Sequence, residues 1–256
     1  LRQVILQEAV QGKLTAKWRE ANPSIENASE LLKRVEVEKN QLLDDKKIKI
    51  EKQLPLIRKD EEKPIVLPKS WVWCRFGQLS RILNGKAYKK EELLQDDSLV
   101  PVLRVGNLFT SKTWYYSNID LEDDKYCEQG DLIYAWSASF GPFIWDGPRS
   151  IYHYHIWKLE HTDLVSKEYL YWYLESETAA IKASGHGIAM IHMTKGKMEL
   201  LITQLPPLEE PLAIVEKVNS LMALCDELKQ EADNSQAQIE QLMQSCLKEV
   251  FVEESN

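Results

Sequence analysis

The chain has 256 residues, 44% of them hydrophobic, enough for one large or two modest domains with a real core. Its 32 Lys and Arg stand against 40 Asp and Glu, and this formal net charge of −8 excludes a protein coated in positive charge that binds any polyanion. Because no run of about 18 apolar residues and no signal-peptide cleavage pattern is present, we expect a cytoplasmic protein without membrane insertion or export.

Residues 1–64 are predicted to form an N-terminal helical segment that ends in a linker. The stretch "LRQVILQEAVQ" places apolar residues at helical spacing, and Gly12 is a suitable stop. A second helix is predicted over "SELLKRVEVEKNQLL", with Asn27 or Ser29 as its N-cap. Two prolines, Pro64 and Pro68, then mark a domain boundary.

Residues 65–208 change to short apolar runs that are rich in aromatic and β-branched residues and are interrupted by Gly, Asp and Asn. These runs are typical of strands: "WVWCRFGQLSRIL", "VPVLRVGNLF", "GDLIYAWSA", "FIWDG" and "YHYHIWKL". One helix is predicted over "SKEYLYWYLESETAAIKA". The sequence therefore predicts an α+β protein with a mixed, strand-rich globular domain.

Residues 209–256 carry a heptad pattern, with apolar or small residues at alternating steps of four and three. An isolated helix cannot bury such a stripe, so it demands a second helix, from this chain or from another. Two of the four cysteines lie on it, where cysteine behaves as a small apolar residue, and all four are expected to be free thiols. We call this stripe the seam; its members are Ile214, Val218, Leu221, Cys225, Leu228, Ala232, Ser235, Ile239, Leu242 and Cys246.

Six fragments, taken in chain order, carry a family resemblance. They are "AVQGKL" (9–14), "LPKSWVWCRFGQL" (67–79), "VLRVGNL" (102–108), "GDLIYAWSASFG" (130–141), "QLPPLEEPLAIV" (204–215) and "LMALCDEL" (221–228). Together they resemble the specificity subunit of type I restriction-modification enzymes. Pro211 departs from the family pattern, which commonly has Gln there, but proline fits the first turn of a helix.

The resemblance implies a division of labour. A target recognition domain reads a few base pairs of double-stranded DNA, and long helices act as a spacer and as the dock for methyltransferase subunits, which restriction and translocase subunits join. Family members usually carry two recognition units and this chain has one, so it resembles a half-subunit or a fragment. Two copies that pair through their helices would read a palindromic bipartite target.

No catalytic motif accompanies this pattern. An adenine methyltransferase would show an Asn/Asp-Pro-Pro-aromatic motif, and a motor would show G-x-x-x-x-G-K-[ST]; both are absent from the sequence. The acidic cluster at 122–126 is interpreted as a turn. The chain is therefore expected to be non-catalytic and to hold no metal or cofactor, while partner subunits use S-adenosylmethionine, ATP and Mg²⁺.

Recognition of DNA requires phosphate anchors and base-edge readers. Lys86, Lys89 and Lys90 beside a glycine suit phosphate contacts, although they also fit a solvated surface. His153 and His155 are expected to share one face of a strand as core or surface residues, since further metal ligands are not evident. The remaining candidates, each with a structural alternative in a core, turn or loop, are Arg104, Lys112, Trp114, Tyr115, Ser137, Ser139, His186 and Lys195.

Two other functions compete with DNA recognition. A coiled-coil adaptor with a protein-binding domain explains the seam and the acidity equally well, but not the ordered family fragments. A hydrolase that uses Cys127 or a histidine lacks a recognisable nucleophile and base arrangement.

Overall fold

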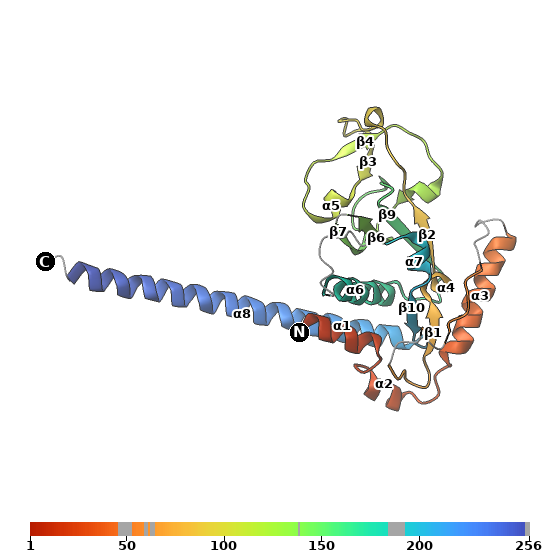
Figure 1. The fold of residues 1–256 in the computed structure, drawn as a ribbon, viewed down its shortest axis with the longest axis horizontal. Helices are drawn as coiled ribbons and strands as arrows, with labels where there is room; N and C mark the ends of the chain where they lie inside the picture. The colour runs from red at the N-terminus through yellow and green to blue at the C-terminus, as the bar shows by residue number, and fades with distance from the viewer. Residues whose placement is uncertain (46–52, 59–60, 62–64, 138, 184–192, 254–256) are drawn as a thin grey trace.

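The computed structural model describes residues 1–256 except 46–52, 59–60, 62–64, 138, 184–192 and 254–256. A strand-rich body rests on helices α1, α6 and α8, and α8 then projects far beyond the body (Figure 1). The α+β class predicted from the sequence is confirmed.

The N-terminal region forms three helices, α1 (Arg2–Val10), α2 (Ala16–Ala21) and α3 (Ala28–Asp44). The chain turns after α1 at Gly12, whose φ of 69° favours glycine, as the stop signal predicts. Asn27 is the N-cap of α3, and its side chain accepts a hydrogen bond from the Ser29 amide at 3.0 Å. The short helix α2 was not predicted from the sequence.

The described strands form three sheets. A two-stranded antiparallel sheet of β1 (Val72–Arg75) and β10 (Ile202–Leu205) ties the start of the middle region to its end. The second sheet is antiparallel in the order β2-β9-β6-β7, and the third has the order β4-β3-β8-β5 with β3 and β8 parallel. Their strands are β2 (Ser80–Asn84), β9 (Ile156–His161), β6 (Leu132–Ser137), β7 (Ser139–Ile144), β4 (Tyr115–Ser117), β3 (Val100–Leu103), β8 (Ser150–Tyr152) and β5 (Tyr126–Cys127).

Two predicted strands are broken by helical turns for the same local reason. In α4 (Phe76–Leu79) the Gln78 side chain accepts a hydrogen bond from the Arg75 amide at 2.8 Å. In α5 (Val105–Phe109) the Asn107 side chain does the same for the Arg104 amide at 3.1 Å. An Arg-x-Gly-Gln or Arg-x-Gly-Asn sequence therefore ends each strand, because the amide side chain returns to the residue before the turn.

The remaining elements are the predicted helix α6 (Lys167–Ala183), α7 (Lys195–Glu199) and the 3-10 turns η2 (Lys90–Glu92) and η3 (Asp123–Lys125). The largest core lies between α3, the second sheet and α6, around Leu31, Phe76 and Tyr173. A smaller core joins the second and third sheets through Leu103, Ile133 and Tyr152. The body is thus built around α6 and these two cores.

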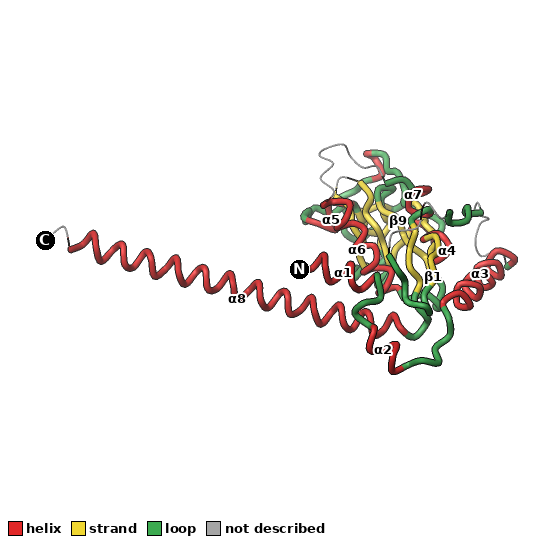
Figure 2. The backbone as a smooth tube through the Cα atoms, turned by 60° about the horizontal axis from the view of Figure 1, so that its bottom comes forward, coloured by secondary structure: helices red, strands yellow, loops and turns green. Residues whose placement is uncertain are grey.

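Helix α8 (Glu210–Glu253) has 44 residues and extends about 66 Å at 1.5 Å per residue. At its start, Ile214 and Val218 are buried against residues of α1 and α6, and Leu221 and Cys225 are partly buried there. Figure 2 shows α1 beside this first part of α8. Farther along, the seam residues Leu228, Ile239 and Leu242 are 50%, 59% and 66% exposed. The first half of the seam is therefore buried or partly buried within the chain, and the second half is exposed to solvent.

A buried carboxylate fixes the point where α8 begins. Glu210 is 0% exposed and accepts hydrogen bonds from Thr15 Oγ1 at 2.6 Å and from Trp71 Nε1 at 2.7 Å. The guanidinium of Arg19, which also donates to the Gly12 carbonyl at 2.6 Å, pairs with the same carboxylate. Since a helix N-terminus stabilises negative charge, the first residue of α8 suits a carboxylate. Pro211 follows it in the first turn, as predicted.

Replacing Glu210 by Ala is expected to lower the free energy of unfolding by about 3 kcal/mol, because it leaves the Arg19 guanidinium and two buried donors unpaired. Urea unfolding followed by tryptophan fluorescence measures this loss. The matched control is Glu209→Ala, at the exposed neighbouring position, which should change stability by less than about 0.5 kcal/mol. Equal effects of the two substitutions would contradict a role of the buried cluster.

Candidate nucleic-acid interface

Residues 153–155 form a tight turn between β8 and β9, which corrects the expectation that both histidines lie on one strand. The His153 amide donates to the Leu103 carbonyl at 2.9 Å, and the Tyr154 amide donates to the Lys86 carbonyl at 2.9 Å. The His155 carbonyl accepts from the Trp136 amide at 3.0 Å. The ends of β2, β3 and β6 thus meet at this turn. Their backbone groups satisfy the amides and the carbonyl of the turn, which in a continuous strand would bond to a neighbouring strand.

Aromatic side chains crowd around the turn, and we call Tyr88, Trp136, His153, Tyr154 and His155 the aromatic turn cluster. The rings of His153 and His155 lie 4.8 Å apart, and Trp136 meets His155 edge-on at 4.9 Å. Tyr88 stacks on His153 at 6.1 Å. The Trp136 indole also donates to the Tyr154 carbonyl at 2.9 Å. Tyr154 remains 39% exposed, so a packed aromatic surface reaches solvent here.

Three of the predicted contact residues lie beside this cluster. The Lys86 ammonium lies 5.4 Å from the Tyr88 ring centroid and pairs with Glu92 at 3.1 Å. The Arg104 guanidinium stacks over the Tyr115 ring at 4.3 Å. The backbone hydrogen bond from Lys89 and then the Lys86 side chain hold the pKa of Glu92 below its ordinary value. Glu92 therefore offsets the charge of Lys86.

Burial keeps the histidines of the cluster neutral. Desolvation lowers the pKa of His153 to about 4, with smaller contributions from His155 and Arg104. Desolvation also lowers the pKa of His155. Burial raises the pKa of Tyr88, with Glu92 adding to the effect, so its hydroxyl stays protonated. Near pH 7 these side chains present hydrogen-bonding edges without charge.

The other predicted contact residues are dispersed. Lys89 and Lys90 are exposed around η2, and Lys112 is exposed in the loop after α5. Ser137 and the exposed Ser139 face each other at the end of the β6–β7 hairpin. Ser137 directly follows Trp136 at the end of β6 that meets the turn, and Ser139 begins β7.

Of the predicted DNA contacts, two lie in the core or on a helix away from the turn, and a third is outside the described residues. Trp114 packs 6.4 Å from Trp145 against the core between the second and third sheets. Lys195 pairs with Glu199 at 3.4 Å on α7, which packs against α4, at the opposite end of β2 from Lys86. His186 lies outside the described residues.

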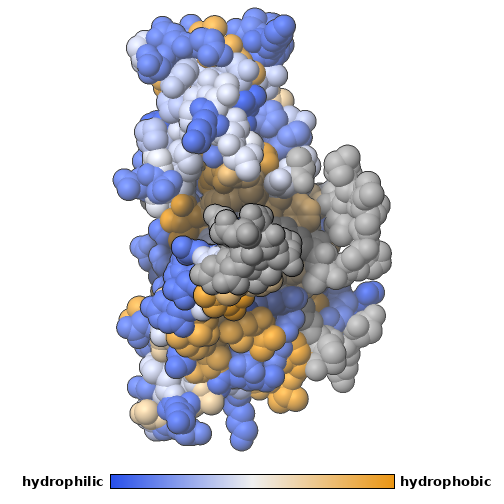
Figure 3. Space-filling view, turned by 90° about the vertical axis from the view of Figure 1, so that its left-hand side faces the viewer, coloured by the Kyte–Doolittle hydropathy of each residue, from blue (hydrophilic) through white to orange (hydrophobic). Residues whose placement is uncertain are grey.

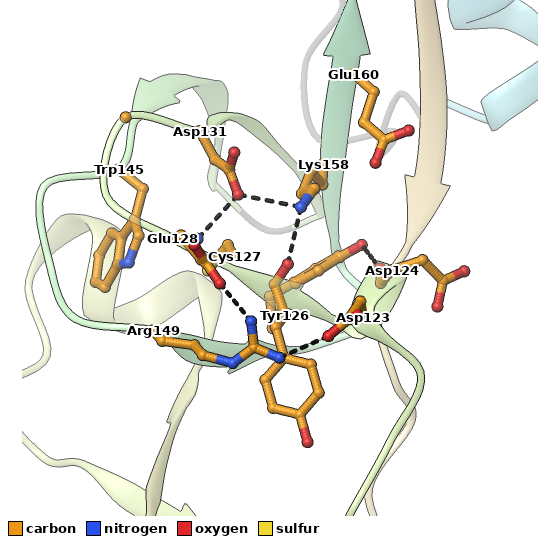
Figure 4. A network of polar contacts seen from close by, with 12 residues as sticks. Asp123, Asp124, Tyr126, Cys127, Glu128, Asp131, Trp145, Arg149, Lys158 and Glu160 are labelled. Carbon is orange, nitrogen blue, oxygen red and sulfur yellow. Dashed lines mark hydrogen bonds and ion pairs between the residues drawn. The ribbon is translucent and has the colours of Figure 1, made fainter. Parts of the chain in front are cut away.

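The acidic segment at 122–126 belongs to a network of ion pairs. Arg149 binds both Asp123, at 2.9 Å, and Glu128, and its guanidinium lies 4.0 Å from the Tyr126 ring centroid (Figure 4). Lys158 pairs with Asp131 at 3.2 Å and donates to the Tyr126 carbonyl at 3.1 Å. These contacts tie β5 to β8 and β9, which agrees with the interpretation of this segment as a structural turn.

Little in the described residues supports a catalytic or metal site. Cys127 is buried, and desolvation raises the pKa of its thiol to about 12, so it is a poor nucleophile. No group of three His, Cys, Asp or Glu side chains placed to hold a metal ion occurs within the described ranges. Among the helices described, none combines the length and the apolarity needed to cross a membrane.

Seen from the left of Figure 1, the two halves of the molecule differ in surface character (Figure 3). The upper part, formed by the third sheet and its loops, is mainly hydrophilic, whereas apolar residues gather in the lower half, on the side of α1 and α8. Exposed apolar residues there include Val4 of α1 and Leu228 of α8. The hydrophilic surface and the exposed apolar residues of the helices therefore lie on different parts of this face.

Comparisons with known proteins identify a family and several relatives of this chain. The family model described as "Type I restriction modification DNA specificity domain" matches residues 68–241. The EcoAI type I restriction enzyme specificity subunit of Escherichia coli is 30% identical over 248 residues, which cover 90% of this chain and 40% of that protein. The EcoEI specificity subunit of the same organism is 53% identical over 79 residues, 31% of this chain and 12% of that protein.

Solved structures show the same fold. The crystal structure of the HsdS subunit from Thermoanaerobacter tengcongensis aligns with a TM-score of 0.54 at 18% identity, covering 88% of this chain and 52% of that one. A structure described for complex assembly and conformational transition of the type I R-M system aligns with a TM-score of 0.59, also at 18% identity, over 94% of this chain and 56% of that one. The chain spans about half the length of these proteins or less, and it belongs to the family of type I restriction-modification DNA specificity subunits.

Proposed function

We propose that this chain is one recognition unit of a type I specificity subunit and that it reads one half of a bipartite double-stranded DNA target. The observation that carries the proposal is the family match over residues 68–241, and the aromatic turn cluster beside Lys86 and Arg104 supports it. In this proposal residues 65–208 are the recognition domain. Methyl transfer and cleavage belong to partner subunits, which use S-adenosylmethionine, ATP and Mg²⁺.

The charge distribution divides the work of binding. Phosphate contacts supply a large share of the affinity of a DNA-binding protein. They need Lys or Arg side chains that are not already paired with a carboxylate. Lys89, Lys90 and Lys112 are exposed, whereas Lys86 is held by Glu92. With a net charge of −8, the isolated chain is expected to bind DNA weakly. Methyltransferase subunits then provide much of the phosphate neutralisation.

Helix α8 acts as the spacer between recognition units. Its outer half exposes seam residues that a second helix would cover, and their heptad spacing suits a helix of the same kind. Two copies of this chain joined through α8 would hold two identical recognition domains at a fixed distance. A two-fold arrangement of this kind reads two identical half-sites in opposite orientation.

The lysine contacts are tested by replacing Lys89, Lys90 and Lys112 together by Ala. Co-expressed with its methyltransferase subunits in a methylation-deficient host, the variant is expected to methylate the same motif at lower occupancy. For the purified complex on a duplex that carries this motif, the salt slope of log K should fall by roughly one unit for each lysine that contacts a phosphate.

The matched control replaces three exposed lysines near α2, at the other end of the body: Lys13, Lys17 and Lys69. This control should leave occupancy and salt slope unchanged. If the wild-type chain, assembled with methyltransferase subunits, yields no methylated motif, the adaptor function takes the place of the proposal.

Pairing through α8 is tested by replacing Leu228 and Leu242 by Asp. Two charges on the seam oppose burial against a second helix, so a dimer of the wild-type chain should become a monomer, which light scattering after size-exclusion chromatography measures. The control places Asp at Gln230 and Gln244, which lie on the helix face opposite the seam, and it should stay dimeric. A wild-type monomer at micromolar concentration would contradict pairing of two copies.

A further inference from the structure

We infer that His153 and His155 are specificity-determining residues that read the edges of bases as uncharged hydrogen-bonding groups, and that His153 does so as a donor. The inference rests on the proposed function and adds to it the residues and the type of contact. His153 was expected from the sequence to be a core or surface residue, as was His155, so neither was counted among the DNA contacts. Three features of the turn carry the inference.

The first feature is a rigid backbone. Residues 153–155 are held at three strand ends: their amides donate to the Leu103 and Lys86 carbonyls, and the Trp136 amide donates to the His155 carbonyl. The Ile156 amide closes the turn onto the His153 carbonyl at 2.8 Å. A base reader gains discrimination when its position is set before binding, because a mobile side chain adapts to the wrong base. This turn is therefore a better platform for reading than the neighbouring exposed loops.

The second feature is a concentration of polar groups that lack partners. The Tyr88 hydroxyl and Arg104 Nε are buried and have no hydrogen-bond partner among the described residues. The ring nitrogens of His155 and Nε2 of His153 are not among the buried unpaired atoms of the described residues, so they are open to solvent or to a ligand. Buried polar groups are nearly always satisfied, so these two unpaired atoms beside solvent-accessible histidine nitrogens favour a polar ligand at the turn. Base edges carry the donors and acceptors that these groups require.

The third feature is the tautomer of His153. The His155 amide donates to Nδ1 of His153 at 3.4 Å, so this nitrogen acts as an acceptor. In a neutral imidazole the proton is then on Nε2, and that nitrogen can only donate. Since the pKa of His153 is about 4, the neutral form holds near pH 7. An Nε2 donor matches the major-groove acceptors, which are N7 of the purines, O6 of guanine and O4 of thymine, and it is opposed by the amino group of cytosine.

Neutral histidines change specificity without adding to phosphate attraction. A cation that contacts the phosphates favours every sequence alike, whereas a neutral donor or acceptor at a base edge gains only at a matching base. The exposed Lys89 and Lys90 directly follow Tyr88 of the aromatic turn cluster, and they supply positive charge separately from the histidines. The structure thus separates sequence-blind attraction from base discrimination over a short stretch of surface.

The test uses the full chain co-expressed with its methyltransferase subunits in a methylation-deficient host, followed by sequencing that detects methylated adenine. His153→Phe and His155→Phe are compared with the wild type. Each variant keeps a ring in the cluster and loses the nitrogens, so methylation of sites that differ at one base pair of each half-site should rise about tenfold relative to the wild-type motif. For His153 the base contacted at the relaxed position is expected to carry a major-groove acceptor and therefore not to be cytosine.

Two controls separate base reading from general damage. His161→Phe makes the same change at the far end of β9, and Lys89→Ala removes a cation, and both should keep the wild-type motif. His153→Gln retains an N–H donor and should preserve the motif better than His153→Phe. If the Phe variants fail to assemble with methyltransferase subunits, His153→Ala and His155→Ala, which also lose the ring nitrogens, decide the question by the same readout.

An unchanged motif at full occupancy in folded Phe or Ala variants of both histidines would overturn the inference and leave the proposed function intact. A wild-type complex that methylates no defined motif would instead contradict the proposed function itself. Relaxation at the same position in the His161→Phe control would also overturn the inference, because it would trace the effect to a general disturbance of β9.

Discussion

The geometry of this molecule depends on one buried carboxylate. Glu210 joins Thr15 and Arg19 of the N-terminal region, Trp71 at the entry to the strand-rich body and the first turn of α8. A buried charge is stable only when it is paired and hydrogen-bonded, so these partners must keep their relative positions. A long helix amplifies any error at its base: over about 66 Å, a rotation of 10° at Glu210 would move the far end by roughly 11 Å. A spacer with a defined reach therefore requires such an anchor.

The two halves of α8 obey different constraints. Near the anchor, Ile214 and Val218 are covered by α1 and α6 and contribute to the core. Beyond α1, residues of the same heptad remain half or more exposed. A continuous apolar stripe of this kind lowers its free energy only by burying the exposed part against a second helix. The proposed pairing of recognition units follows from this unequal burial.

At the other end of the body, the proposed recognition surface carries little unpaired charge of its own. The acidic segment near Asp123 is neutralised by Arg149 and stabilises the third sheet. Glu92 offsets Lys86, and burial keeps His153 neutral. What remains at the surface is a rigid, aromatic and largely uncharged turn with exposed lysines nearby. An acidic protein can recognise DNA in this way when partner subunits supply the remaining positive charge.

The sequence by itself determined the features that depend on local pattern. The heptad spacing predicted α8, and Asn27 and Gly12 marked helix ends. The short apolar runs predicted the α+β class, and the ordered fragments predicted the family. The breaks at α4 and α5 could have been found from the repeated Arg-x-Gly-Gln and Arg-x-Gly-Asn sequences, whose amide side chains close a turn.

Only the tertiary structure decided which residues share a surface. His153 was expected on a strand, but the ends of β2, β3 and β6 converge on it and force a turn. Trp114, predicted as a DNA contact, packs against a core, and the Arg104 guanidinium stacks on the Tyr115 ring. Such neighbours come from strands far apart in the sequence, and pairing between distant strands leaves no periodic signal in either one. The partners of Glu210, spread from Thr15 to Trp71, were hidden for the same reason.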